Sequence, residues 1–157
     1  MVSEVAVAPV VVVRADEDIA HVRAWISTHA EKWAHQGFPI VDDNDRLVGV
    51  VTRRDLLNGS GSEGATTVRG AVRRAPVVVF DDSSLRDAAD LMAHEGVGRL
   101  PVVARDEPDR VIGILTRSDV IAAHTRRLEG ERLNDPKYRL PRRLGRTTAA
   151  VRKVSPP

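Results

Sequence analysis

Apolar residues along this chain occur in short runs separated by polar turns. A run of valines at 10–13 is followed by an acidic stretch and by apolar residues at helical spacing from Ile19 to Ile26. Two further runs, 38–41 and 47–51, are rich in β-branched residues and are separated by a charged turn. The pattern predicts a strand, a helix and a two-stranded hairpin.

The same order returns in the second half of the chain. Valines at 77–79 precede helical spacing from Leu85 to Met92, and apolar runs follow at 100–103 and 111–115. The offset between the copies is 62 residues before the hairpin turn and 64 after it. The change in length therefore falls in the turn, where it costs least.

A short polar motif closes each copy. The sequence Thr-Arg-X-Asp, followed by two apolar residues, occurs at Thr52–Asp55 and again at Thr116–Asp119. It predicts the start of a second helix, so each copy is expected to run strand, helix, strand, turn, strand, helix. A lead-in helix is predicted before the second copy at 66–72, with no clear counterpart before the first.

These elements predict an α/β (α+β) fold of two β-α-β-β-α units. One unit of about 60 residues buries little core alone, so we expect the two to pack sheet to sheet into one compact module. The expected divisions are a first repeat at 1–58, a linker at 59–65, a second repeat at 66–125 and a basic, largely flexible tail at 126–157.

Composition narrows the class of protein. Hydrophobic residues make up 42% and charged residues 29%, an ordinary globular balance. The absence of cysteine excludes disulfides and thiolate chemistry, and fits a cytoplasmic location. The longest apolar run, Val5–Val13, is far shorter than the roughly 20 residues of a membrane helix. No basic segment precedes it, so we do not expect a signal peptide.

Charge is distributed unevenly although the net charge is only +2. Residues 126–157 hold ten basic and three acidic side chains, a net charge of +7, which leaves −5 on residues 1–125. A solvated tail is the simplest interpretation, and contact with anionic lipid or nucleic acid is the alternative.

Catalytic and metal-binding patterns are missing from the sequence. No phosphate-binding glycine loop, nucleophile elbow or zinc-protease motif is present, and the five histidines show no ligand spacing with carboxylates. Trp25 and Trp33, eight residues apart, are interpreted as packing or interface residues. We therefore expect no enzyme, no metal and no required cofactor.

The Thr-Arg-X-Asp motif admits two interpretations. As a capping box it needs no ligand, because the acid at the third helical position reaches back to the cap. The motif could also bind an anionic ligand, because the free N–H groups at the helix start would point into a cleft. The arginines beside it (Arg53, Arg54, Arg117) are unfavourable at a helix start, and a bound phosphate would offset their charge. Ser118 replaces the second arginine in the later copy, so the first copy is expected to take the more anionic ligand.

The duplicated pattern resembles a pair of CBS domains over residues 9–57 and 68–125, with Gly-X-X-Thr-X-X-Asp in both copies. More narrowly, residues 35–42, 115–121 and 124–129 resemble the cytoplasmic CBS tails of bacterial voltage-gated (ClC) chloride channels. In the family, the matching Thr and Asp contact the ribose and phosphate of adenine nucleotides.

The resemblance implies a non-catalytic regulatory module that senses AMP, ADP or ATP between its repeats. It also implies a homodimer, and control of a chloride channel or another membrane partner. The expected nucleotide-binding residues are Thr52, Arg53, Arg54, Asp55, Thr116, Arg117, Ser118 and Asp119, with Phe38, Pro39, Leu100, Pro101, Val12 and Val78 as apolar contacts. The alternatives are a ligand-free dimerisation module, or a nucleic-acid or anionic-membrane binder acting through the tail.

Overall fold

A computed structural model describes residues 1–8, 10–28, 37–58 and 64–134. The chain divides into two units, Met1–His124 and Thr125–Pro157. The first unit holds both repeats, and the described part of the second is the end of a helix that starts in the first.

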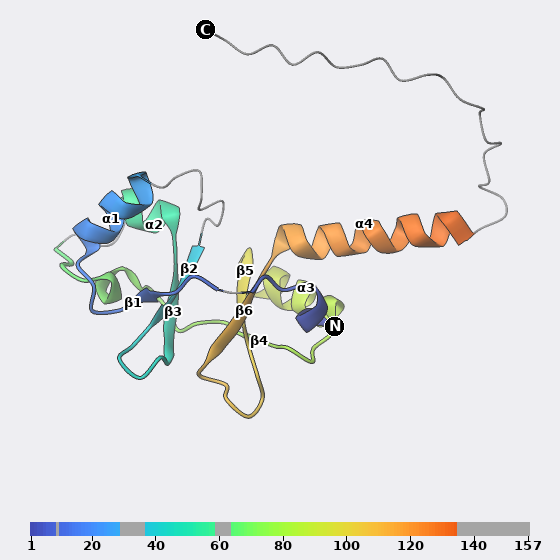
Figure 1. The fold of residues 1–157 in the computed structure, drawn as a ribbon, viewed down its shortest axis with the longest axis horizontal. Coiled ribbons are helices and arrows are strands. Elements are labelled where there is room, and N and C mark those ends of the chain that lie inside the picture. Colours follow the sequence, from blue (N-terminus) through green and yellow to red (C-terminus); the bar gives the residue numbers. More distant parts are fainter. Residues whose placement is uncertain (9, 29–36, 59–63, 135–157) are drawn as a thin grey trace, which may run out of the picture. The chain divides into compact units, whose positions relative to one another are not determined.

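The first repeat forms a three-stranded sheet in the order β1-β2-β3 with two helices (Figure 1). Strand β1 is parallel to β2, and β2 is antiparallel to β3. The elements are β1 (Val13–Arg14), α1 (Ile19–Thr28), β2 (Gly37–Val41), β3 (Leu47–Thr52) and α2 (Arg53–Asn58).

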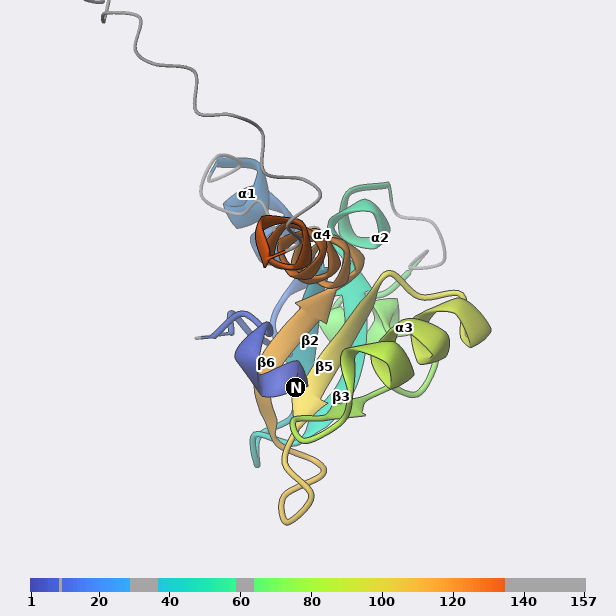
Figure 2. The same ribbon diagram turned by 90° about the vertical axis from the view of Figure 1, so that its right-hand side faces the viewer.

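The second repeat has the same topology, with sheet order β4-β5-β6. Its elements are β4 (Val79–Phe80), α3 (Leu85–His94), β5 (Arg99–Val103), β6 (Val111–Thr116) and α4 (Arg117–Asn134). The two sheets lie next to each other, and both hairpin turns lie at the same end (Figures 1 and 2). There the Leu47 N–H donates to the Asp109 carbonyl at 2.7 Å. The predicted element order and fold class are confirmed.

Each sheet carries a helix whose apolar face matches the predicted spacing. Helix α1 buries Ile19, Val22 and Ile26, and Asp18 accepts the His21 N–H at 2.9 Å at its start. Helix α3 buries Ala88 and Met92, and the Ser84 hydroxyl accepts the Asp87 N–H at 3.0 Å.

The apolar interior forms two clusters, one for each repeat. The first includes Phe38, Ile40, Val51 and Leu56, all at most 1% exposed. The second includes Leu100 and Leu115, both fully buried. The clusters belong to different sheets, so each repeat has its own core.

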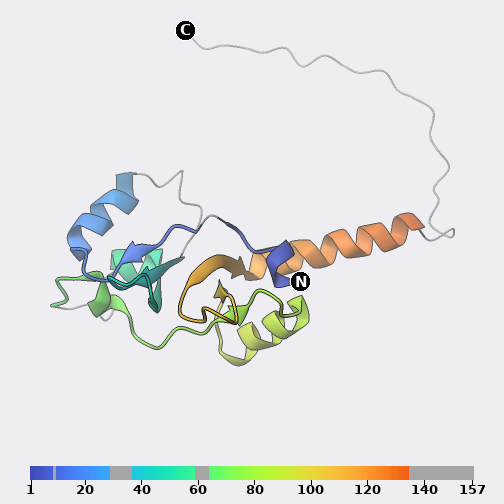
Figure 3. The ribbon, with the colours of Figure 1, turned by 60° about the horizontal axis from the view of Figure 1, so that its bottom comes forward.

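Short lead-in helices cross between the repeats. The 3-10 helix η2 (Val68–Ala71) precedes the second repeat but packs in the first core, and its Val68 N–H donates to the Glu17 carbonyl at 3.0 Å. A matching 3-10 helix, η1 (Val2–Glu4), packs in the second core, and its Val2 N–H donates to the Ser83 carbonyl at 3.0 Å. Figure 3 shows both chain segments crossing between the repeats.

Helix η1 corrects the expectation that the first repeat has no lead-in. It spans only three residues, which is too short for a periodic apolar pattern to reveal it. Its buried valine gains its packing from residues about 80 positions later in the chain.

The expected tail begins in a helix. Helix α4 continues to Asn134, so residues 126–134 are helical. Residues 135–157 lie outside the described part of the chain. Among the described residues, no helix is long and apolar enough to cross a membrane.

Candidate functional site

Both Thr-Arg-X-Asp motifs form the same hydrogen-bonded box at the start of a helix. The Asp55 carboxylate accepts the Thr52 N–H at 2.9 Å and the Thr52 hydroxyl at 2.6 Å, both through Oδ2. The Asp55 N–H donates to Thr52 Oγ1 at 3.1 Å. Thr116 and Asp119 repeat these contacts at 2.8, 2.6 and 3.2 Å. The capping interpretation is confirmed in both copies.

We expect Thr52→Ala to lower the free energy of unfolding by about 1 kcal/mol, because it removes both side-chain hydrogen bonds of the box. Urea denaturation measures the change. Thr67→Ala is the matched control, since Thr67 also precedes a helix but its side chain caps no N–H group. An equal loss in both variants would contradict a specific capping role for Thr52.

The first box opens onto a cleft of about 310 Å³ that both repeats line. This volume is at the lower end of small-molecule sites in proteins. From the first repeat come Val50, Thr52 and Asp55. From the second come Ala71, Arg73, Arg74, Ala75, Pro76, Val77, Gly96, Val97, Gly98 and Arg99. Among the described residues, the lining therefore combines apolar side chains with three arginines and one carboxylate.

The three arginines of the cleft differ in their surroundings. Arg73 and Arg74 are exposed, and Arg74 Nη1 donates to the Glu95 carbonyl at 3.3 Å. Arg99 is half-buried, and its Nε is buried with no hydrogen-bond partner. Burial lowers the pKa of Arg99, because desolvation disfavours the charged form. Within the described ranges, no ion pair compensates this charge.

The predicted polar residues divide between cleft and surroundings. Thr52 and Asp55 line the cleft, whereas Arg53 and Arg54 do not. Arg54 is exposed, and Arg53 keeps a buried Nε without a partner. Near the second box, Ser118 is exposed.

Arg117, the predicted arginine of the second copy, is also placed outside the first cleft. It is exposed, and its Nη2 donates to the Val97 carbonyl at 3.3 Å. The cations that line the first cleft therefore come from segments that the sequence motif does not include.

The predicted apolar contacts lie elsewhere. Four are buried in the interior: Phe38, Pro39, Leu100 and Pro101. Val12 is 41% exposed and lines a separate hollow beside Trp25, and Val78 is half-buried outside the cleft. Residues so deeply packed have no surface left for an adenine ring, so the apolar part of the lining is formed by Val50, Pro76 and Val77 instead.

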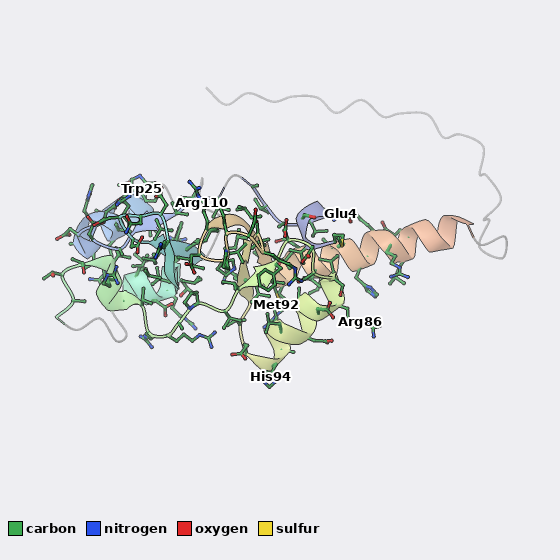
Figure 4. The ribbon with its side chains drawn as sticks, turned by 90° about the horizontal axis from the view of Figure 1, so that it is seen from below. Glu4, Trp25, Arg86, Met92, His94 and Arg110 are labelled. Carbon is green, nitrogen blue, oxygen red and sulfur yellow. The ribbon has the colours of Figure 1, made fainter. Side chains whose placement is uncertain are left out.

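Several predicted features lie outside the described residues. Residues 34–36, which correspond to Gly96–Gly98 in the repeat alignment, are among them, as is Trp33. Trp25 is half-buried against the first core, as expected of a packing residue (Figure 4). The described residues contain no group of side chains that could hold a metal ion.

A comparison with models of known protein families shows the family to which the chain belongs. The family model of the CBS domain matches it twice, at residues 2–61 and 68–125. The chain belongs to the CBS domain family. The two matches coincide with the two sheets and their lead-in helices, so the protein carries a tandem CBS pair.

Two solved structures illustrate the similarity of the fold. The structure of CBSX2 in complex with AMP shares 31% identity and a TM-score of 0.67, covering 81% of this chain and 97% of that one. CBSX2 is a chloroplastic CBS protein of Arabidopsis thaliana. The cytosolic domain of the Mg²⁺ channel MgtE in complex with ATP shares 29% identity and a TM-score of 0.61, covering 73% of this chain and 44% of that one.

Curated relatives are mostly longer proteins. Inosine-5'-monophosphate dehydrogenase of Methanocaldococcus jannaschii is 33% identical over 110 residues, which are 70% of this chain and 21% of the relative. The chain spans between 21% and 29% of the length of the first three curated relatives. The narrower resemblance to chloride-channel tails stays a prediction.

Proposed function

We propose that this tandem CBS pair is a non-catalytic regulatory module that senses an adenine nucleotide in the Thr52–Asp55 cleft. The observation that carries the proposal is the composition of this cleft. A hydrogen-bonded threonine–aspartate pair, several apolar side chains and three arginines line one cleft of about 310 Å³.

Each part of the cleft suits one part of a nucleotide. The described hydrogen bonds to the Asp55 carboxylate all use Oδ2, which leaves Oδ1 for a ribose hydroxyl. Val50, Pro76 and Val77 provide apolar surface for the adenine. Arg73 and Arg74 can pair with phosphate oxygens. The AMP complex of CBSX2 and the ATP complex of MgtE support an adenine nucleotide as the ligand.

Binding at this position would couple the two repeats. The cleft joins the start of α2 to the segment from Ala71 to Val77, so a bound ligand favours the arrangement in which these elements are close. We propose that this shift is transmitted to a partner protein, a membrane channel or transporter being the class that the MgtE resemblance favours. We further propose a cytoplasmic homodimer.

Isothermal titration with AMP, ADP and ATP tests the proposal. At least one nucleotide should bind, and Asp55→Asn should weaken it about tenfold to a hundredfold, because the variant removes a charged acceptor. Asp90→Asn on the exposed side of α3 is the matched control and should bind like the unchanged protein.

Two results would contradict the proposal. One is the absence of both binding heat and a thermal shift with all three nucleotides, which would favour a ligand-free dimerisation module. The other is unchanged affinity in Asp55→Asn, which would place the nucleotide elsewhere. Asp119→Asn, measured in the same way, tests whether the Thr116–Asp119 box also contributes to nucleotide binding.

A further inference from the structure

One loop of the second repeat lines the cleft and also contacts the last helix. The loop at residues 95–98 joins α3 to β5, and its last three residues line the Thr52–Asp55 cleft. The loop ends α3 in a defined turn, because Gly96 has a φ of +65° and the Val97 N–H donates to the Met92 carbonyl at 3.0 Å. A ligand in the cleft would therefore contact a loop whose backbone has one ordered conformation.

The same loop is hydrogen-bonded to Arg117, the first residue of α4. The Arg117 N–H donates to the Gly98 carbonyl at 3.0 Å, and Arg117 Nη2 donates to the Val97 carbonyl at 3.3 Å. The N–H groups at the start of a helix have no partner within the helix, so contacts of this kind anchor it. A movement of the loop must therefore shift or release the start of α4.

Helix α4 depends on such anchors because little of it is buried. It has 18 residues, whereas its counterpart α2 has 6 (Figure 1). Val120 packs against the second core, but from Ile121 to Gly130 every side chain except that of Ala123 is exposed. A helix of this length is marginal in water without packing. Its stability is therefore set near its start, where Arg117 lies.

We propose that α4 is the output element of the module, and that Arg117 transmits occupancy of the Thr52–Asp55 cleft to it. A nucleotide in the cleft favours the loop conformation described above, and the two Arg117 hydrogen bonds then keep the first turns of α4 closed. Because α4 contains the start of the basic segment 126–157, the signal reaches the part of the chain beyond the repeats. This inference rests on the proposed function and adds the route by which its signal leaves the repeats.

Amide hydrogen exchange of the full chain, followed by NMR, tests the route. Spectra are compared without ligand and with AMP or ATP, whichever binds more tightly, at about ten times its Kd. Exchange at residues 121–124 should slow about tenfold, because a ligand suppresses an opening that is incompatible with binding by the factor 1 + [L]/Kd. Exchange at residues 131–134 should not change, since the far end of a helix frays without the opening of its start.

Arg117→Met isolates the side-chain contact. The variant should lose more than half of the nucleotide-dependent protection at residues 121–124, because it removes the donor to the Val97 carbonyl. Its nucleotide affinity should change by less than about twofold, since Arg117 lies outside the cleft and the loop stays mostly closed. Arg126→Met removes the same charge from an exposed position of the same helix and should keep the full protection.

Two further variants separate a positioning role from a general effect on the helix. Arg117→Pro removes both hydrogen bonds to the loop but keeps a residue that is favoured at the first helical position. It should abolish the protection while α4 still forms. Arg117→Lys keeps a cationic donor without the planar guanidinium and should restore part of the protection lost in Arg117→Met.

The outcomes separate the two proposals. Nucleotide binding with unchanged exchange at residues 121–124 would overturn the role of α4 but leave the adenine-sensing cleft. Full protection in both Arg117→Met and Arg117→Pro would overturn the route through Arg117. Equal slowing at residues 121–124 and 131–134 would also overturn it, since that pattern indicates a general stabilisation. Failure of AMP, ADP and ATP to bind would overturn this inference together with the proposed function.

Discussion

Val2→Asp is expected to lower the free energy of unfolding by about 4 kcal/mol at pH 7. Val2 is fully buried in the core of the second repeat, so the carboxyl must be neutral in the folded protein. Protonating a carboxyl with an ordinary pKa near 3.9 costs about 1.4 kcal/mol for each pH unit above that value. Urea denaturation between pH 4 and pH 7 measures the loss.

The pH dependence identifies the cause. Burial raises the pKa of the introduced carboxyl in the folded state, so the variant is least impaired near pH 4 and loses stability as the pH rises. Val2→Asn is the matched control, with similar size and polarity but no titration. Hydrogen exchange should rise first in β4–β6. Loss confined to β1–β3, or a pH-independent loss, would contradict the packing of η1 in the second core.

Local sequence patterns were sufficient for most elements of the fold. The strands and helices follow from apolar runs and helical spacing, and the Thr-X-X-Asp boxes follow from contacts three residues apart. Helix η1 was not predictable in this way, since its three residues have no period and its burial depends on the other repeat.

Only part of the cleft could be predicted, because some of its residues come from the other repeat and not from a local motif. Thr52 and Asp55 belong to one local motif, but Arg99 reaches the cleft from the other repeat and only because Gly37 has no side chain. The role of Phe38 could not be decided from the sequence, because an apolar residue near a strand start can line a cleft or pack in a core. In this structure Phe38 packs in the core. The sequence feature that could have indicated Arg99 is the position of this arginine at the start of an apolar run.

Gly49→Ala is expected to lower the free energy of unfolding by about 1 to 3 kcal/mol, the usual cost of overpacking. A Cβ at position 49 would lie 2.2 Å from Val72 Cγ1 and 3.0 Å from its Cγ2, and valine has no rotatable end that could move aside. The lead-in segment must therefore shift. Because Arg73 and Arg74 follow directly, nucleotide affinity should fall as well.

A double-mutant cycle with Val72→Ala isolates this contact. Removing both Cγ atoms leaves the Val72 Cβ at 3.2 Å, so the double variant should be more stable than the sum of the single losses predicts, by about 1 kcal/mol. Gly130→Ala is the control for adding a methyl group, because a Cβ there meets no atom within 4 Å and should stabilise α4. Strictly additive losses would show that the Val72 side chain does not pack against Gly49. They would also contradict the expected link between the position of the lead-in segment and nucleotide affinity.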